Sequence, residues 1–458
     1  MIKKPNILFI VLDGVRAQSL SCYGNKKQTS PHLDAFAEKC VIYKKAFATA
    51  NNSNSSHTSL LTGLYPNEHG VYADQPFFKK QSFSLANILH NAGYATYLIN
   101  PIYLLSYYFG HTAGFDGVYQ MWQFITQSQN EDIFYNSNFH KLPKWRRYAY
   151  YIKHLLPLRS SARIFTSLAN RRYSHFFDIY NDSSFATTRS IDRAIKTLQR
   201  NTHTPIFMYL VLMEAHEEYN PPNRIRSLFN IPRQLKSCHQ LDHYTKKRIT
   251  THEEFAMQKS LYEASIYFQD EQLGRLLSCI ESLGASDDMM VIVVADHGGH
   301  FGEKGHCGNL LSLYNEVIHV PLLVKYPSYT EVKPAVNDFL VQTTDIYATV
   351  LEVLGMPNET GSISLLTDKK RKAAFSEMII HPSVADLLDA NLSRSLRAVI
   401  HNDGFKYIDS EKRGSELYNI LDDPHEERNL NRDPKYHDTR EMLAGLLAGF
   451  NFRSWPVH

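Results

Sequence analysis

Two residues that could bind a divalent cation stand directly after the most apolar stretch of the chain. Residues 289–295 read Met-Met-Val-Ile-Val-Val-Ala, which is typical of a buried strand in a parallel sheet. Asp296 and His297 follow at once, and Gly298 and Gly299 let the backbone approach an ion closely. Polar groups after a buried strand must find partners, and carboxylate with imidazole suits a divalent metal. The pattern therefore predicts a ligand site here.

Asp13 follows a second apolar run, because residues 7–12 read Ile-Leu-Phe-Ile-Val-Leu. In open α/β sheets, ligands bind beyond the carboxyl ends of the strands. Asp13 is therefore a candidate ligand, although an aspartate after a strand is also a common turn residue. Arg16 lies in the same loop and is a candidate to bind an anionic substrate. His216 follows a predicted strand at 207–213 and should reach the same edge.

A hydroxyl-rich segment, residues 48–63, could provide a nucleophile. It reads Ala-Thr-Ala-Asn-Asn-Ser-Asn-Ser-Ser-His-Thr-Ser-Leu-Leu-Thr-Gly. Small polar residues suit the start of a helix, where unpaired N–H groups attract anions. A serine in that field would favour its alkoxide and a facing phosphate or sulfate. The segment could also be an ordinary polar cap of a short helix.

Alternating helices and strands must position these residues. The chain predicts a helix over 84–90 that ends near Gly93, and a strand over 94–99. A long amphipathic helix is expected over 255–283. This alternation is typical of an α/β fold with a mostly parallel sheet flanked by helices.

The chain divides into two predicted domains. Residues 1–375 should form the catalytic domain, and residues 376–458 an antiparallel subdomain built from short strands and closed by a helix. An insertion over about 101–181 is rich in Tyr, Phe and Trp, and its second half is basic. It could be a lid for an anionic substrate, a membrane-surface patch, or solvated basic helices.

Composition narrows the class of protein. The net charge of +3 over 458 residues indicates no general preference for nucleic acid. The five cysteines are scattered without a C-x-x-C pair, which argues against a disulfide framework. The first apolar run is too short for a signal peptide, and no stretch is long enough to span a membrane. We therefore expect a cytoplasmic protein.

Motifs along nearly the whole chain resemble the sulfatase branch of the alkaline-phosphatase superfamily. The resemblance implies an alkaline-phosphatase-like fold and an enzyme that acts on esters of an oxyanion. The segments that carry it are residues 5–13, 22–24, 30–34, 60–63, 69–71, 92–94, 270–277, 296–298, 320–322 and 416–430.

The resemblance also points to the nucleophile. The helix start of sulfatases reads C-x-P-S-R or S-x-P-S-R, and its first residue becomes formylglycine; counting back from Gly63 places Ser53 there. Ser55 stands where that motif has Pro, and His57 where it has Arg. Gly14 stands where many sulfatases have a second metal-binding Asp. These departures resemble relatives that use an unmodified Ser or Thr on phosphate and phosphonate esters.

The implied mechanism uses one divalent cation, Mn, Zn, Mg or Ca. Its predicted ligands are Asp13, Ser53, Asp296 and His297. Ser53 would attack phosphorus and form a covalent phosphoserine, which water or an acceptor alcohol then releases. Three histidines are candidates to contact the non-bridging oxygens or protonate the leaving group, and they are His306, which we favour, His57 and His216.

Two alternatives remain open at this point. One is a true sulfatase, a sulfuric ester hydrolase with formylglycine at position 53. The other is a catalytically silent relative that binds an anionic ligand. In each case the expected partner is a small-molecule or lipid-head-group anion, and the sequence does not specify an oligomeric state.

Overall fold

The computed structural model describes residues 4–120 and 184–453. Within these ranges it leaves out residues 202, 239, 245–250, 285, 381–384, 386–387, 389–391 and 412–413. The insertion predicted for about 101–181 therefore lies outside the described residues from position 121 onward. No helix in the described part of the chain is long and apolar enough to cross a membrane.

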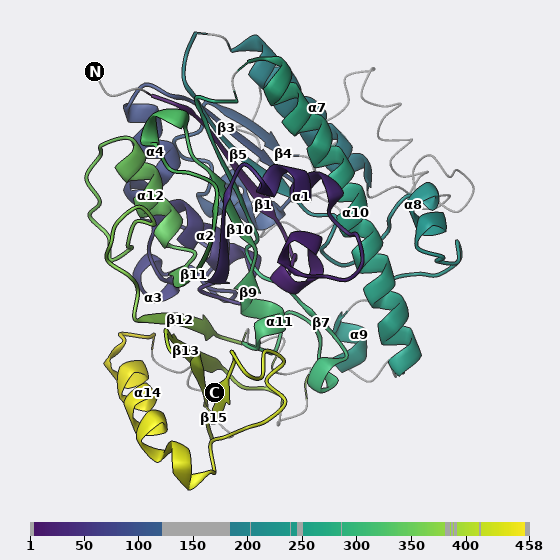
Figure 1. Ribbon diagram of the computed structural model, residues 1–458, viewed down its shortest axis with the longest axis vertical. Helices are drawn as coiled ribbons and strands as arrows, with labels where there is room; N and C mark the ends of the chain where they lie inside the picture. The colour runs from purple at the N-terminus through teal and green to yellow at the C-terminus, as the bar shows by residue number, and fades with distance from the viewer. Residues whose placement is uncertain are drawn as a thin grey trace, which may run out of the picture.

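A nine-stranded sheet occupies the centre of the molecule (Figure 1), in the order β11-β2-β10-β6-β1-β5-β3-β4, with β9 paired to β2. Most neighbours are parallel, whereas β10 is antiparallel to both β6 and β2. The predicted α/β class with a mostly parallel sheet is confirmed. The strands are β1 (Asn6–Leu12), β2 (Val41–Phe47), β3 (Ala95–Asn100), β4 (Gly117–Gln120), β5 (Ile206–Leu212), β6 (Met289–Val294), β9 (His319–Val320), β10 (Leu322–Lys325) and β11 (Ala335–Gln342).

Helices cover both faces of this sheet (Figure 1). One face carries α1 (Pro31–Ala37), α7 (Ser184–Arg200) and α10 (His252–Ser282), which pack against one another. The other carries α2 (Ser53–Thr62), α4 (Leu85–Asn91) and α12 (Asp345–Val353). Shorter helices in the connections are α3 (Pro66–His69), α8 (Asn223–Leu228), α9 (Gln240–Tyr244) and α11 (Asn315–Ile318). The strands are buried on both faces, which explains their continuous apolar sequences.

Strand register brings the predicted ligand loops to one edge of the sheet. β1 is parallel to both β5 and β6, with Leu12 opposite Leu212 and Val11 opposite Val294. The Asp13 N–H donates to the carbonyl of Leu212 at 2.9 Å, which extends the ladder beyond the strand. The loops that follow β1, β5 and β6 therefore begin side by side.

The C-terminal region forms a second, antiparallel sheet of β12 (Ala373–Met378), β13 (Leu396–His401), β14 (Phe405–Ser410) and β15 (Glu416–Asn419). Helix α14 (His437–Gly449) covers one face, where Leu443 and Leu447 pack on Val399 and Leu417. The opposite face packs on the domain of the central sheet, where it contacts Phe47, Val317 and Leu340. The predicted domain boundary after residue 375 falls within β12. The sequence analysis did not predict this strand.

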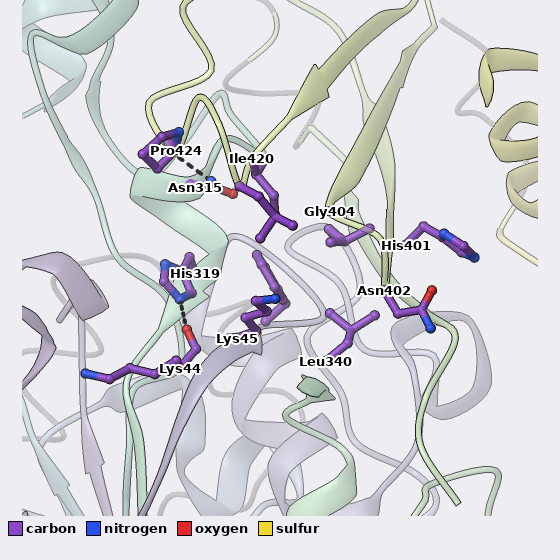
Figure 2. A pocket seen from close by; sticks show the side chains of 13 residues that line it. Lys44, Lys45, Asn315, His319, Leu340, His401, Asn402, Gly404, Ile420 and Pro424 are labelled. Atoms are coloured by element: carbon purple, nitrogen blue, oxygen red, sulfur yellow. Dashed lines mark hydrogen bonds between the residues drawn. The ribbon is translucent and has the colours of Figure 1, made fainter. Parts of the chain in front are cut away.

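A cavity of about 210 Å³ lies between the two sheets (Figure 2). Its walls come from β2, β11 and β13, and it is bordered by Lys45, Leu340 and Ile420. His319 donates through Nε2 to the carbonyl of Lys44 at 2.7 Å, which ties β9 to β2 beside the cavity. The cavity interrupts the apolar packing between the two sheets, and polar contacts beside it also join the second sheet to α11.

A buried ion pair is one of these polar contacts. Lys406 Nζ lies 2.8 Å from Glu426 Oε1, and both side chains are 0% exposed. Glu426 Oε2 also accepts the Asn315 N–H at 2.6 Å, at the start of α11. Lys406 Nζ donates to Asn315 Oδ1 at 3.1 Å. Two buried charges thus join the second sheet to α11.

We expect Glu426→Gln to lower the free energy of unfolding by about 3–5 kcal/mol, because it leaves the Lys406 ammonium buried without its counter-charge. Urea unfolding followed by circular dichroism measures the change. Glu427→Gln is the matched control, since Glu427 is the exposed neighbour and should change stability by only about 0.5 kcal/mol. Equal unfolding midpoints for the two variants would contradict this account.

Candidate active site

The loops after β1 and β6 hold two buried carboxylates next to each other. Asp296 Oδ1 accepts the N–H of Gly14 at 3.2 Å and the N–H of His297 at 2.9 Å. These contacts fix the Asp296 carboxylate and leave its Oδ2 for other ligands. Gly14 adopts φ +76°, and a Cβ there would lie 2.9 Å from the carbonyl oxygen of Ala215, so a larger residue would be strained.

Ser53 is the first residue of α2 and faces this pair. Its Oγ lies 3.3 Å from Asp13 Oδ2 and 3.1 Å from His297 Nε2. The helix starts here because the Asn52 side chain caps it, accepting the Ser55 N–H at 3.1 Å. The structure therefore brings together the four residues predicted as metal ligands.

His57 lies one helical turn after Ser53 and reaches the same group of side chains, which is called the centre below. Its Nε2 is 3.4 Å from Asp296 Oδ2, and its side chain is 0% exposed. On the other side of the ring, Nδ1 lies 2.7 Å from the hydroxyl of Tyr209 on β5. The sequence predicts that His57 contacts the non-bridging oxygens or protonates the leaving group, and the structure places its ring beside the carboxylates.

The donor atoms fit a divalent cation. Among the described residues, Asp13 Oδ1, Asp296 Oδ2 and His57 Nε2 are buried without a hydrogen-bond partner. One ligand atom from each of these three side chains lies within 4.8 Å of the others. Burying polar atoms without partners, and burying two negative charges side by side, both cost folding free energy. A cation bound between these atoms would offset both costs.

The two carboxylates differ in their electrostatic surroundings. Burial, together with the charge of Asp296, raises the pKa of Asp13 to about 7. Burial also opposes ionisation of Asp296, but His297 and His57 hold its pKa below the usual range. Without a cation, one carboxyl group of this pair therefore keeps a proton near neutral pH, and a bound cation would displace it.

The orientation of the His297 ring suits a ligand. Nδ1 donates to the carbonyl of Gly298 at 2.9 Å, so Nε2 carries the lone pair that faces Ser53. The Asn309 amide nitrogen lies 3.3 Å from the same Nε2. A Cβ at Gly298 would lie 2.3 Å from the carbonyl oxygen of Glu316, so this close packing requires glycine.

His216 borders the same centre from the loop after β5. Its ring centroid lies 6.3 Å from that of His297, and its side chain is half-buried. Nδ1 donates to the carbonyl of Glu217 at 2.7 Å, which leaves Nε2 as the basic nitrogen. This position is compatible with the predicted contact to substrate.

The structure shows Arg16 and His306 with partners outside the set of predicted metal ligands. The Arg16 guanidinium is buried and pairs with Glu303 at 2.9 Å. His306 lies beside Tyr244, whose hydroxyl is 3.3 Å from its Nδ1, and burial lowers the pKa of His306 to about 3. Neither side chain has a hydrogen bond or ion pair with the four predicted ligands among the described residues. Proximity in sequence to Asp13 and His297 therefore did not place either side chain in direct polar contact with those ligands in the described part of the chain.

Two residues at the centre were missed from the sequence. Asn309 directly follows the short strand β8 (Cys307–Gly308) and also donates to the carbonyl of Asn51 at 2.7 Å. Tyr209 interrupts the apolar strand β5 with a single hydroxyl. A lone polar group in a buried strand must find a partner, which is the signal that could have identified Tyr209.

A family model described as Sulfatase matches residues 5–356, more than half of the chain. The protein belongs to the sulfatase family. A second model, described as N-sulphoglucosamine sulphohydrolase, C-terminal, matches residues 302–451 of this sulfatase-family protein. The resemblance inferred from the motifs is confirmed.

Curated relatives and solved structures cover almost all of this sulfatase-family chain. It is 22% identical to the N-acetylglucosamine-6-O-sulfatase of Bacteroides thetaiotaomicron, over 97% of this chain and 86% of that protein. It is also 22% identical to the arylsulfatase of Clostridium perfringens, over 97% of this chain and 94% of that protein. Phosphonate monoester hydrolase of Agrobacterium radiobacter shares its fold, with a TM-score of 0.73, 20% identity and coverage of 97% and 95%.

A further solved structure of the same fold contains D-glucosamine-2-N,6-O-disulfate as the substrate of that protein. It has a TM-score of 0.68 at 19% identity, and it covers 97% of each chain. At these identities the structural likeness concerns the fold. Sulfate esters and phosphonate esters are thus both represented among the proteins that this chain resembles.

Proposed function

We propose that this protein is a metal-dependent hydrolase, or transferase, of phosphate or phosphonate esters that uses Ser53 as an unmodified nucleophile. The observation that carries the proposal is the position of the Ser53 hydroxyl, 3.3 Å from Asp13 and 3.1 Å from His297 at the start of α2. A serine at a helix start beside cation ligands is suited to attack an oxyanion ester.

The surroundings of Ser53 support an unmodified side chain. Ser55 donates its backbone N–H to Asn52, a contact that the proline of the maturation motif could not make. Its hydroxyl donates to the carbonyl of Val71 at 3.0 Å. His57 replaces the arginine of the same motif. The segment thus departs from the formylglycine motif at two positions, and Ser55 makes hydrogen bonds through both its N–H and its hydroxyl.

A bound cation would lower the pKa of the Ser53 hydroxyl and neutralise a phosphoryl oxygen. Ser53 Oγ forms a bond to phosphorus while the bond from phosphorus to the leaving oxygen breaks, and the hydroxyl proton passes to the basic Nε2 of His216. The imidazolium of His216 then gives that proton to the leaving oxygen. Water, or an acceptor alcohol, next attacks the phosphoserine and gives a proton to His216, and His216 passes it to the departing Ser53 oxygen.

A second candidate function is hydrolysis of sulfate esters. It is supported by the names of the curated relatives above, which are sulfatases. It requires an aldehyde at position 53, because the formylglycine hydrate is the nucleophile in that chemistry. The two candidates therefore differ in one chemical group that can be measured directly.

The test combines mass spectrometry with an activity panel. We expect the peptide that contains Ser53 to have the mass of unmodified serine, whereas formylglycine would lower it by about two mass units. We expect turnover of p-nitrophenyl phosphate, a phosphodiester or a phosphonate ester after reloading with Mn, Zn, Mg or Ca, and little turnover of the sulfate ester. Formylglycine with sulfate turnover would establish the sulfatase, and no turnover with any metal would favour a silent relative.

A further inference from the structure

We propose that His57 is a ligand of the cation, so that the site offers two imidazoles and two carboxylates and selects zinc or a similar transition metal over calcium and magnesium. The inference rests on the metal centre of the proposed function, but on neither its substrate nor its nucleophile. It concerns a position at which the family's maturation motif has arginine.

The geometry of helix α2 places His57 on the same side as Ser53, next to the centre. Residues four apart lie on the same face of a helix, so Ser53 and His57 of α2 project in the same direction. Ser53 Oγ reaches Asp13 and His297, and His57 Nε2 reaches Asp296 Oδ2. One turn of helix therefore presents both the nucleophile and an imidazole to the same pair of carboxylates.

The distances between donor atoms suit one shared ion. His57 Nε2 and His297 Nε2 lie 3.4 and 3.5 Å from the same atom, Asp296 Oδ2. Zinc binds nitrogen and oxygen at roughly 2.0–2.2 Å, so two ligands of one tetrahedral ion are about 3.4 Å apart. His297 Nε2 and Asp13 Oδ1 are 3.9 Å apart, which small side-chain rotations would reduce.

The His57 ring is held in place with its free nitrogen toward the carboxylates. Nε2 is buried and has no hydrogen-bond partner among the described residues. Tyr209 contacts Nδ1 at 2.7 Å, and the two rings pack edge to face with centroids 5.8 Å apart. Metal-binding histidines commonly donate their second N–H to an acceptor, and the Tyr209 oxygen can fill that role.

The donor set determines the preferred metal. Calcium and magnesium favour oxygen ligands, whereas imidazole favours zinc and its neighbours. With arginine at position 57 the site would keep a single imidazole, His297. Histidine at position 57 adds a neutral nitrogen donor in place of a fixed positive charge, and this change is the physical basis of the metal preference.

In a different role, His57 would be protonated and would form an ion pair with Asp296, as an arginine at this position would. The distinction is testable, because Arg keeps the charge and lacks the ligand atom. His57→Arg and His57→Gln should therefore behave alike if His57 binds metal. His57→Arg should resemble the unchanged protein if the charge is what matters.

The test uses the full chain, stripped of metal and titrated separately with Zn²⁺ and Mg²⁺ by calorimetry. We expect His57→Gln and His57→Arg each to weaken zinc binding by at least about 100-fold and to change magnesium binding far less. Tyr209→Phe should weaken zinc binding by roughly 10-fold, as expected for an outer-shell partner. His90→Gln is the control, because His90 is exposed and pairs with Asp116.

Zinc-edge X-ray absorption of the unchanged protein gives a second readout that does not depend on any variant. Two imidazoles on the bound zinc would support the proposal, and one would overturn it. Zinc binding that survives His57→Arg would overturn it as well, while leaving the metal centre intact. If the unchanged protein bound neither ion, both this inference and the metal centre of the proposed function would fail.

Discussion

Ser53→Ala should lower turnover of a phosphate or phosphonate ester by on the order of 10⁴-fold or more. Removing the nucleophile of a covalent mechanism eliminates the attacking atom and leaves only binding and charge stabilisation. The Ser53 hydroxyl is the one group at the start of α2 that contacts both Asp13 and His297 among the described residues. Steady-state kinetics with p-nitrophenyl phosphate, measured on metal-loaded protein, gives the ratio.

The matched control for this substitution is Ser56→Ala on the same helix. The Ser56 hydroxyl donates to the carbonyl of Ala50 at 3.0 Å, away from the carboxylates. Its loss should cost about 1 kcal/mol of stability and change turnover far less than Ser53→Ala. Metal content should be similar in both variants. If Ser53→Ala kept a tenth or more of the activity with metal bound, Ser53 would not be the nucleophile.

Asp296→Asn should abolish activity through loss of the cation. Asp296 Oδ2 lies 3.4 Å from His57 Nε2 and 3.5 Å from His297 Nε2, and an amide that kept the N–H contacts on Oδ1 would place an NH₂ group there. The NH₂ group of an amide has no lone pair to offer a cation, so it cannot replace the carboxylate oxygen as a ligand beside the two ring nitrogens. We expect metal affinity to fall by at least about 100-fold, beyond the usual loss for an outer-shell partner, and turnover to fall with it.

Metal analysis and EDTA treatment distinguish this effect from unfolding. EDTA should inactivate the unchanged protein, and added metal should restore it, whereas Asp296→Asn should stay inactive under the same additions. Asp270→Asn is the control: Asp270 is a buried carboxylate that accepts the backbone N–H groups of His32 and Leu33, both at 2.8 Å. The Asp270→Asn protein should be less stable than the unchanged protein and should keep its metal. Metal bound normally by Asp296→Asn would exclude Asp296 as a ligand.

Apolar patterning predicted the central strands well, because a strand buried on both faces must be apolar throughout. β1, β5 and β6 all agree with their predicted positions to within a residue or two at each end. The edge strand β11 was missed because three of its first four residues are exposed and two of the four, Asn337 and Asp338, are polar. β2 carries Lys44 and Lys45 in its middle, so no continuous apolar run marks it.

Sequence alone identified the loops that meet at the candidate site, since Asp13 and Asp296 each follow an apolar strand and the motifs place Ser53 at a helix start. It could not determine which residues of those loops turn inward. Tertiary structure decided that Arg16 pairs with Glu303, that His306 packs beside Tyr244, and that His57 and Asn309 reach the centre. The physical reason is that strand identity is encoded by local burial, whereas a side chain's partner depends on strand order and on contacts between residues hundreds of positions apart.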